Sequence, residues 1–147
     1  MSHSYSCNLV HCVFSTKTRA DSIPKDIQER LYAYVQGTAR KLGIQILALG
    51  RTANHVHVLM VLPATKTLSD AVRDLKANSS RWMREKCSEF SWQEGFGAFS
   101  VSPSSAEIVK QYIRNQALHH QKRNFEEEFV TLLRKCRVSY DPKYVFD

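Results

Sequence analysis

The sequence contains no long hydrophobic run and little glycine or proline. Its 147 residues include 5 Gly and 4 Pro, too few for a collagen-like or linker-rich chain. The longest apolar stretch, residues 58–62, is far shorter than the roughly 20 residues of a membrane helix. No basic segment followed by a long apolar stretch opens the chain. We therefore expect no secretory signal, no membrane partner and a cytoplasmic location.

Motifs that bind nucleotides or expose a nucleophilic serine are also absent. The sequence has no G-x-x-x-x-G-K-[ST], no G-x-G-x-x-G and no G-x-S-x-G. These absences argue against a P-loop, a dinucleotide site and a serine hydrolase elbow. Any phosphoryl chemistry in this chain is therefore expected to proceed without a nucleotide cofactor.

The cysteines form no recognisable metal or redox motif. There are four of them, Cys7, Cys12, Cys87 and Cys136, and no two make a C-x-x-C pair. A chain of this length does not need disulfides to fold. We expect free thiols, most of them buried.

The composition that remains is that of a basic globular protein. Hydrophobic residues make up 43% and charged residues 24%, which favours a packed core over disorder. The length predicts one domain spanning residues 1–147. Lys and Arg exceed Asp and Glu by 21 to 14, a net charge of +7. Such an excess favours a polyanionic partner, for example a nucleic acid.

Hydrophobic periodicity predicts the element order β-α-β-β-α-β-α-α. Strand patterns cover residues 5–16, 44–49, 54–62 and 96–101. Helices are expected from Pro24 to residue 42, after a cap at Thr67, from the box Ser104-x-x-Glu107 to about residue 120, and after Asn124-x-x-Glu127. The first six elements match an α+β, ferredoxin-like split βαβ sandwich with a four-stranded antiparallel sheet, and additional C-terminal helices follow. The third helix or a partner subunit would cover the second face of the sheet.

The first candidate site is the triplet His55-Val56-His57 on the third predicted strand. Residues i and i+2 of a strand project from the same face, so the two imidazoles would lie side by side and Val56 would face the core. Two adjacent imidazoles can share one divalent metal ion. Two histidines on an ordinary polar strand face are the structural alternative.

The second candidate site is Tyr112-x-x-x-Gln116 on the third predicted helix. Four residues make about one helical turn, so the phenol and the amide share a face. Gln116 could offer a metal its amide oxygen, and Tyr112 could attack an electrophile polarised by that metal. His119 and His120 follow, and each could be a ligand, a phosphate contact or part of a solvated helix end.

Basic residues mark two candidate contacts for a nucleic acid. Lys17 and Arg19 follow the first strand, and Lys76 and Arg81 lie on the second helix. Lysine and arginine at such positions could contact phosphates, or they could simply belong to solvated faces. Trp82 lies on the apolar stripe of the same helix and is expected in the core.

Together these segments resemble the single-tyrosine HUH transposases of the insertion sequence 200/605 type. The resemblance spans nearly the whole chain. It is carried by FSTK at residues 14–17, NHVH at 54–57, LKxxSSRW at 75–82, WQxGFGAFSVS at 92–102 and YIxxQxxHH at 112–120.

The resemblance implies an enzyme that cleaves and rejoins single-stranded DNA next to hairpins at the ends of an insertion sequence. It also implies a homodimer, in which the active sites can be shared between subunits. Carried onto this sequence, His55 and His57 would bind Mg²⁺ or Mn²⁺ with Gln116 as third ligand. Tyr112 would be the nucleophile and would form a 5′-phosphotyrosine intermediate.

Two other functions compete with this interpretation. An RRM-like module would bind single-stranded nucleic acid on its sheet without catalysis, but it needs aromatic residues where the third strand has histidines. A metal-dependent hydrolase could use His55 and His57 with a cysteine such as Cys12 around zinc, and would leave no protein–DNA adduct.

Overall fold

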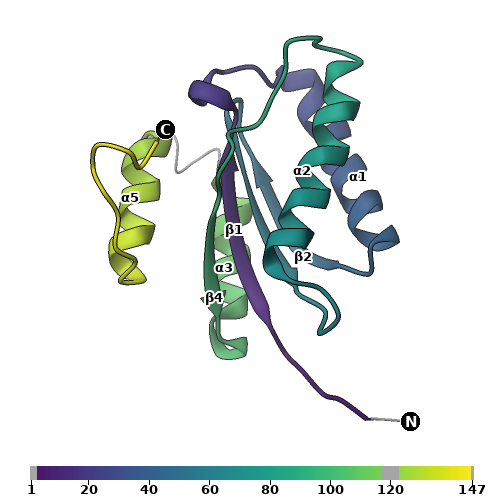
Figure 1. Cartoon of the computed structure of the whole chain (residues 1–147), viewed down its shortest axis with the longest axis vertical. Helices are drawn as coiled ribbons and strands as arrows, with labels where there is room; N and C mark the ends of the chain where they lie inside the picture. Colours follow the sequence, from purple (N-terminus) through teal and green to yellow (C-terminus); the bar gives the residue numbers. More distant parts are fainter. Residues whose placement is uncertain (1–2, 117–122, 147) are drawn as a thin grey trace.

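The structure, a computed structural model, describes residues 3–116 and 123–146. The strands are β1 (Leu9–Ser15), β2 (Gln45–Arg51), β3 (His55–Val61) and β4 (Gly97–Val101), and Figure 1 shows how they lie relative to the helices. The helices are α1 (Lys25–Lys41), α2 (Leu68–Arg84), α3 (Ala106–Arg114) and α5 (Phe125–Lys135). Two short 3₁₀ turns, η1 (Lys17–Arg19) and η2 (Pro103–Ser105), follow β1 and β4.

The four strands form one sheet in the order β2-β3-β1-β4, and every pair of neighbours is antiparallel. The α1 crossover joins β1 to β2, and the α2 crossover joins β3 to β4, so each crossover skips one strand. This is the predicted ferredoxin-like split βαβ arrangement. The strand register places His57 between Val13 of β1 and Gly50 of β2.

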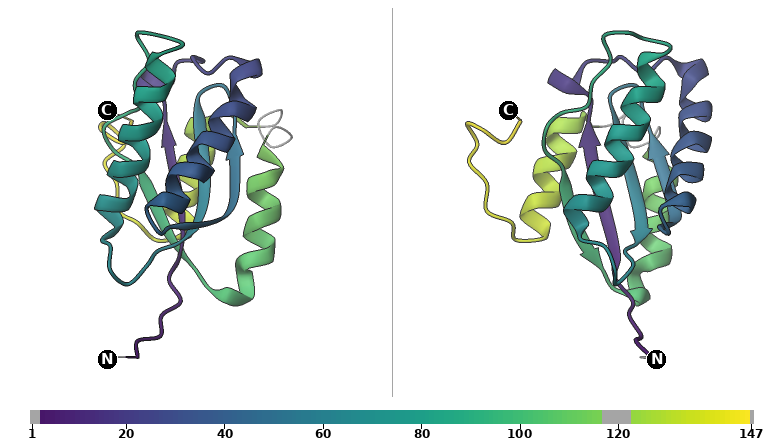
Figure 2. Two further views of the ribbon diagram at one scale, coloured as in Figure 1. Left: turned by 90° about the vertical axis from the view of Figure 1, so that its right-hand side faces the viewer. Right: turned by 45° about the vertical axis from the view of Figure 1, so that its right-hand side comes forward.

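The alternation of side chains along the strands separates two cores. On one face, Cys12, Phe14, Val56 and Val58 pack with buried residues of α1 and α2. On the other face, Leu9 and Leu59 pack with Ile113 of α3, and Val13 and Phe99 pack with residues of α5. Figure 2 shows α1 and α2 on one side of the sheet and α3 on the other. Helices of the same chain therefore cover the second face.

Local capping signals explain where two of the helices begin. Thr67 accepts a hydrogen bond from the Asp70 backbone N–H at 3.1 Å, and Asn124 accepts one from Glu127 at 2.8 Å. Both predicted caps are confirmed, because each side-chain oxygen satisfies an N–H that lacks a partner within the helix.

The predicted capping box at Ser104 is wrong. Pro103–Ser105 forms the turn η2, and α3 begins only at Ala106. The Ser104 hydroxyl instead lies 3.0 Å from the Ser102 hydroxyl. The helix also ends earlier than expected, at Arg114, while the predicted end near residue 120 lies outside the described residues.

The cysteines are free, but only Cys12 is buried. Cys7 and Cys136 are exposed and Cys87 is partly buried, so the expectation of mostly buried thiols is wrong. Cys7 precedes β1 and Cys136 follows α5, so both lie outside the strands and helices that form the cores. Within residues 3–116 and 123–146, no helix has the length and apolar character needed to cross a membrane.

Candidate metal and nucleophile site

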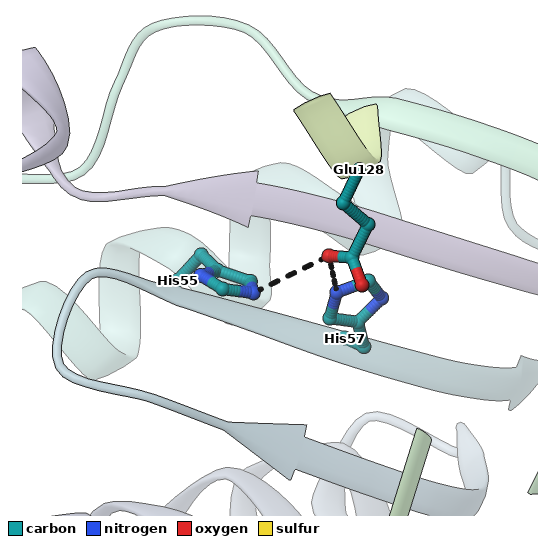
Figure 3. A group of neighbouring side chains, drawn as sticks. All are labelled: His55, His57 and Glu128. Atoms are coloured by element: carbon teal, nitrogen blue, oxygen red, sulfur yellow. Dashed lines mark hydrogen bonds and ion pairs between the residues drawn. The ribbon is translucent and has the colours of Figure 1, made fainter. Parts of the chain in front are cut away.

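The two histidines of β3 lie side by side and are completely buried, each with 0% exposure. Both Nε2 atoms are directed at Oε1 of Glu128, at 3.6 Å from His55 and 2.8 Å from His57 (Figure 3). Val56, between them, lies in the opposite core. The strand alternation therefore places the imidazoles as predicted.

The carboxylate of Glu128 was not predicted from the sequence. Glu128 is 3% exposed and lies on the apolar side of α5, in the turn between Phe125 and Phe129. The sequence carries a signal for it, because a charged residue inside an apolar stripe is rarely buried without a partner. The capping pattern instead singled out Glu127, whose backbone N–H donates to the capping residue Asn124 and whose side chain is exposed.

Tyr112 of α3 reaches the same carboxylate from another side. Its hydroxyl donates a hydrogen bond to Oε2 of Glu128, and its ring centroid lies 5.9 Å from that of His57. Burial, followed by the hydrogen bond and the charge of Glu128, raises the pKa of Tyr112 above its ordinary value. The phenol is therefore protonated near neutral pH.

His11 of β1 completes the buried cluster and was also missed. Its Nε2 lies 2.8 Å from Nδ1 of His57, and the side chain is 4% exposed. Burial, helped by His57 and opposed by Glu128, lowers the pKa of His11 to about 3, so the ring is neutral. The sequence could not signal this contact, because it depends on how β1 pairs with β3.

The ring of His55 is oriented by its own loop. Its Nδ1 lies 2.7 Å from Oδ1 of Asn54 and 2.9 Å from Oγ1 of Thr52. Since an amide oxygen only accepts, Asn54 favours a proton on Nδ1 of His55. The Nε2 lone pair is then directed toward Glu128, which is the tautomer that a metal ligand requires.

Gln116 is buried beside the cluster, with 1% exposure. Its amide nitrogen donates to the Tyr112 backbone oxygen at 3.2 Å. A Cβ added to Gly50 would lie 2.1 Å from the Ile113 oxygen and 2.9 Å from Cγ of Gln116. Because Gly50 pairs with His57, this close packing brings the end of α3 and Gln116 next to the histidine strand. His119 and His120 lie outside the described residues.

The donor set suits a divalent ion. The ligand atoms of His55, His57 and Glu128 all lie within 4.8 Å of one another. Neighbouring ligands of an octahedral ion with bonds of 2.0–2.1 Å are about 3 Å apart. Imidazole and carboxylate together bind several divalent metals. His55, His57 and Glu128 could therefore hold a divalent metal ion.

The predicted alternative of a zinc site made of His55, His57 and Cys12 is wrong. Cys12 is buried in the core beneath α1 and α2, on the opposite face of the sheet from the histidines. Burial raises the pKa of its thiol to about 12, which disfavours the thiolate that zinc binds. The RRM-like alternative also loses support, because helices cover both faces of the sheet.

Two of the predicted DNA contacts are engaged within the protein. The ammonium of Lys76 donates to three backbone oxygens, those of Gln93, Glu94 and Gly95, at 2.6, 3.1 and 2.9 Å. Arg19 pairs with Glu126 at 2.7 Å and donates to the Phe146 oxygen at 2.9 Å. Both side chains hold neighbouring segments in place, and their contact with DNA stays a prediction.

The other basic candidates are exposed. Lys17 lies in η1, and Arg81 on α2 donates to Asn78 at 2.8 Å. Trp82, on the same helix, packs partly buried against the core and stacks on Tyr34 with centroids 5.2 Å apart. Trp82 was expected in the core, and it does pack against the core, but it is only partly buried, at the edge between α1 and α2.

Solved structures with the same fold include two transposases. A candidate transposase from Deinococcus radiodurans R1 aligns with a TM-score of 0.63 and 22% identity, covering 79% of this chain and 96% of that one. A REP-associated tyrosine transposase, solved bound to a REP hairpin, aligns with a TM-score of 0.62 and 16% identity, covering 82% and 74%. A comparison with curated proteins finds no match.

Residues 3–116 match the family described as "Transposase IS200 like". The matched segment contains β1 to α3, with His11, the two histidines of β3, Tyr112 and Gln116, while α5 and Glu128 lie beyond it. A match over this much of the chain, together with the shared fold, shows that the chain belongs to the IS200-like transposase family.

Proposed function

We propose that this transposase cleaves and rejoins single-stranded DNA, with Tyr112 as the nucleophile. The observation that carries the proposal is the position of Glu128. One of its oxygens accepts the hydrogen bond of the Tyr112 hydroxyl, and the other lies 2.8 Å from Nε2 of His57. The hydroxyl that would attack and the groups that would hold a metal therefore meet at one buried carboxylate.

The reaction exchanges one phosphodiester bond for another. The Tyr112 oxygen attacks a DNA phosphorus, an O–P bond to tyrosine forms, and the bond from phosphorus to O3′ breaks. The tyrosine proton passes to Oε2 of Glu128, and the departing O3′ takes up a proton to give a 3′-hydroxyl. Because the new bond resembles the old one, a 3′-hydroxyl can reverse the reaction and reseal the strand without a nucleotide cofactor.

The metal would be held by His55 and His57, with Glu128 and Gln116 as candidate oxygen donors. When bound, Mg²⁺ or Mn²⁺ would offset negative charge on the scissile phosphate and orient it. Asn54 and Thr52 hold the ring of His55 in the tautomer that this requires. Both imidazoles are fully buried, and Phe125 of α5 lies against the ring of His55 with ring centroids 4.7 Å apart.

The substrate we propose is single-stranded DNA next to a hairpin. The net charge of +7 favours a polyanion, and one related structure contains a REP hairpin. We further propose one domain spanning residues 1–147 and a homodimer. The described chain brings Tyr112 to its own His57, so each subunit would carry a complete site, whereas the resemblance also allows sites shared between subunits.

A denaturing gel tests the proposal. A single-stranded oligonucleotide carrying a hairpin from the DNA that flanks the gene, labelled at its 3′ end, is incubated with protein and Mn²⁺. We expect a labelled band of protein plus DNA that is absent with Tyr112→Phe or with EDTA. The variant Tyr5→Phe, changed at a residue that is 93% exposed, serves as the matched control. Cleavage that survives Tyr112→Phe and leaves no adduct would instead favour a hydrolase.

A further inference from the structure

His11 lies beside Nδ1 of His57, whereas Glu128 lies beside the other ring nitrogen, Nε2. Its Nε2 is 2.8 Å from Nδ1 of His57, and the ring centroids are 5.0 Å apart. The ring is enclosed by Phe99 of β4 and Tyr112 of α3, with centroids 6.2 and 6.3 Å away. His11 is 4% exposed, so bulk water does not compete for this contact.

His57 therefore has a defined partner at each ring nitrogen. Its Nε2 faces Oε1 of Glu128 at 2.8 Å, and its Nδ1 faces His11. In one arrangement of the protons, Nε2 of His57 donates to the carboxylate and its Nδ1 accepts from Nε2–H of His11. A metal at Nε2 needs the lone pair there, which moves the proton of His57 to Nδ1.

The partner of Nδ1 must then change from donor to acceptor. A neutral imidazole can do this, because its single proton can sit on either nitrogen. With the proton of His11 on Nδ1, its Nε2 accepts from Nδ1–H of His57. Both arrangements keep the hydrogen bond between the two rings and need no additional proton.

We propose that His11 is a positioning residue that holds His57 in the tautomer needed to bind the divalent metal. The inference rests on the proposed function, since it assumes that His57 is a metal ligand. His11 acts through its contact with His57 and is not itself a ligand of the metal. Residues that orient metal-binding histidines in this way typically change metal affinity about 10- to 100-fold when they are removed.

The test measures Mn²⁺ binding by titration calorimetry in the absence of DNA. The variants are His11→Leu, which cannot hydrogen-bond, and His11→Gln, whose amide can donate or accept. We expect Mn²⁺ affinity to fall about tenfold or more with His11→Leu and to stay close to that of the unchanged protein with His11→Gln. His3→Gln, at an exposed position, controls for the loss of a histidine. Melting curves recorded without metal verify that each variant folds, and His11→Phe replaces His11→Leu if that variant does not.

Equal Mn²⁺ affinity in His11→Leu and the unchanged protein would overturn the inference while leaving the proposed function intact. An equal loss in His11→Leu and His11→Gln would also overturn it, because packing rather than hydrogen bonding would then be responsible. Absence of Mn²⁺ binding in the unchanged protein would overturn both this inference and the proposed metal site. Adduct formation on the gel reports on Tyr112 separately.

Discussion

Tyr112 and Glu128 are joined by a hydrogen bond from the phenol to Oε2 of the carboxylate, although they belong to different helices. The same carboxylate reaches His57 through Oε1 at 2.8 Å. Tyr112 and Gln116 lie within the segment that matches the transposase family, whereas Glu128 lies beyond it. A residue outside the family match thus connects the candidate nucleophile to the candidate metal ligands.

Removing the Tyr112 hydroxyl should destabilise the fold. Tyr112→Phe leaves the buried Glu128 carboxylate without the hydrogen bond that it accepts from the phenol, which costs about 1–3 kcal/mol of unfolding free energy. Urea denaturation measures the loss. Tyr5→Phe, at an exposed position, should leave the stability unchanged. If Tyr112→Phe is as stable as the unchanged protein, the hydrogen bond contributes nothing to folding.

Neutralising Glu128 should weaken metal binding. Glu128→Gln removes the negative charge next to both histidines, and we expect Mn²⁺ affinity to fall about tenfold or more, since hard cations favour carboxylates. The rise in melting temperature caused by Mn²⁺ should shrink accordingly. Glu127→Gln, an exposed neighbour on α5, should behave like the unchanged protein. An unaltered response to Mn²⁺ in Glu128→Gln would remove Glu128 from the ligand set.

Adding a methyl group at Gly50 should disturb the packing of α3 on the sheet. The new Cβ would lie 2.1 Å from the Ile113 backbone oxygen, so α3 must shift at a cost of about 1–3 kcal/mol or more. Gly37, inside α1, has open space around the same position, and Gly37→Ala should stabilise by about 0.5–1 kcal/mol. Thermal or urea unfolding measures the stability of both variants. Equal destabilisation by the Gly50→Ala and Gly37→Ala changes would contradict the prediction.

Lys76 and Arg81, both predicted to bind DNA, should behave differently. Lys76→Met removes charged hydrogen bonds to three backbone oxygens and should lower the unfolding free energy by about 1–3 kcal/mol. Arg81 is exposed, so Arg81→Ala should alter stability by less than about 0.5 kcal/mol. If Arg81 contacts a phosphate, the affinity for DNA should fall and depend less steeply on salt. Urea unfolding and DNA titrations at several salt concentrations separate the two roles.

The stability of the protein should decrease at alkaline pH through Cys12. Burial raises the pKa of this thiol from 9.0 to about 12, so the unfolded chain loses the proton first as the pH rises. Between these two values the unfolded state binds fewer protons, and the unfolding free energy falls by up to about 1.4 kcal/mol per pH unit. Cys12→Val should show a shallower decline than the unchanged protein from pH 9 to 11. Parallel pH curves for the two proteins would contradict the prediction.

Local patterns in the sequence determined much of the fold. The two-residue period of β3 predicted that His55 and His57 share one face and that Val56 enters the core. Capping side chains predicted the starts of α2 and α5. These features depend on residues a few positions apart, whose geometry follows from the backbone alone. The exception was η2, where Pro103 precedes a turn that delays the start of α3.

Only the tertiary structure decided what surrounds the histidines. His11 lies 46 positions and Glu128 71 positions from His57 in the sequence. They meet because β1 pairs with β3 in one register and because α5 docks on the histidine face through Phe125 and Phe129. Register and docking follow from how whole apolar surfaces fit together. The sequence alone therefore identified His55, His57 and Tyr112, while long-range packing supplied the carboxylate that connects His57 to Tyr112 and a third imidazole, that of His11.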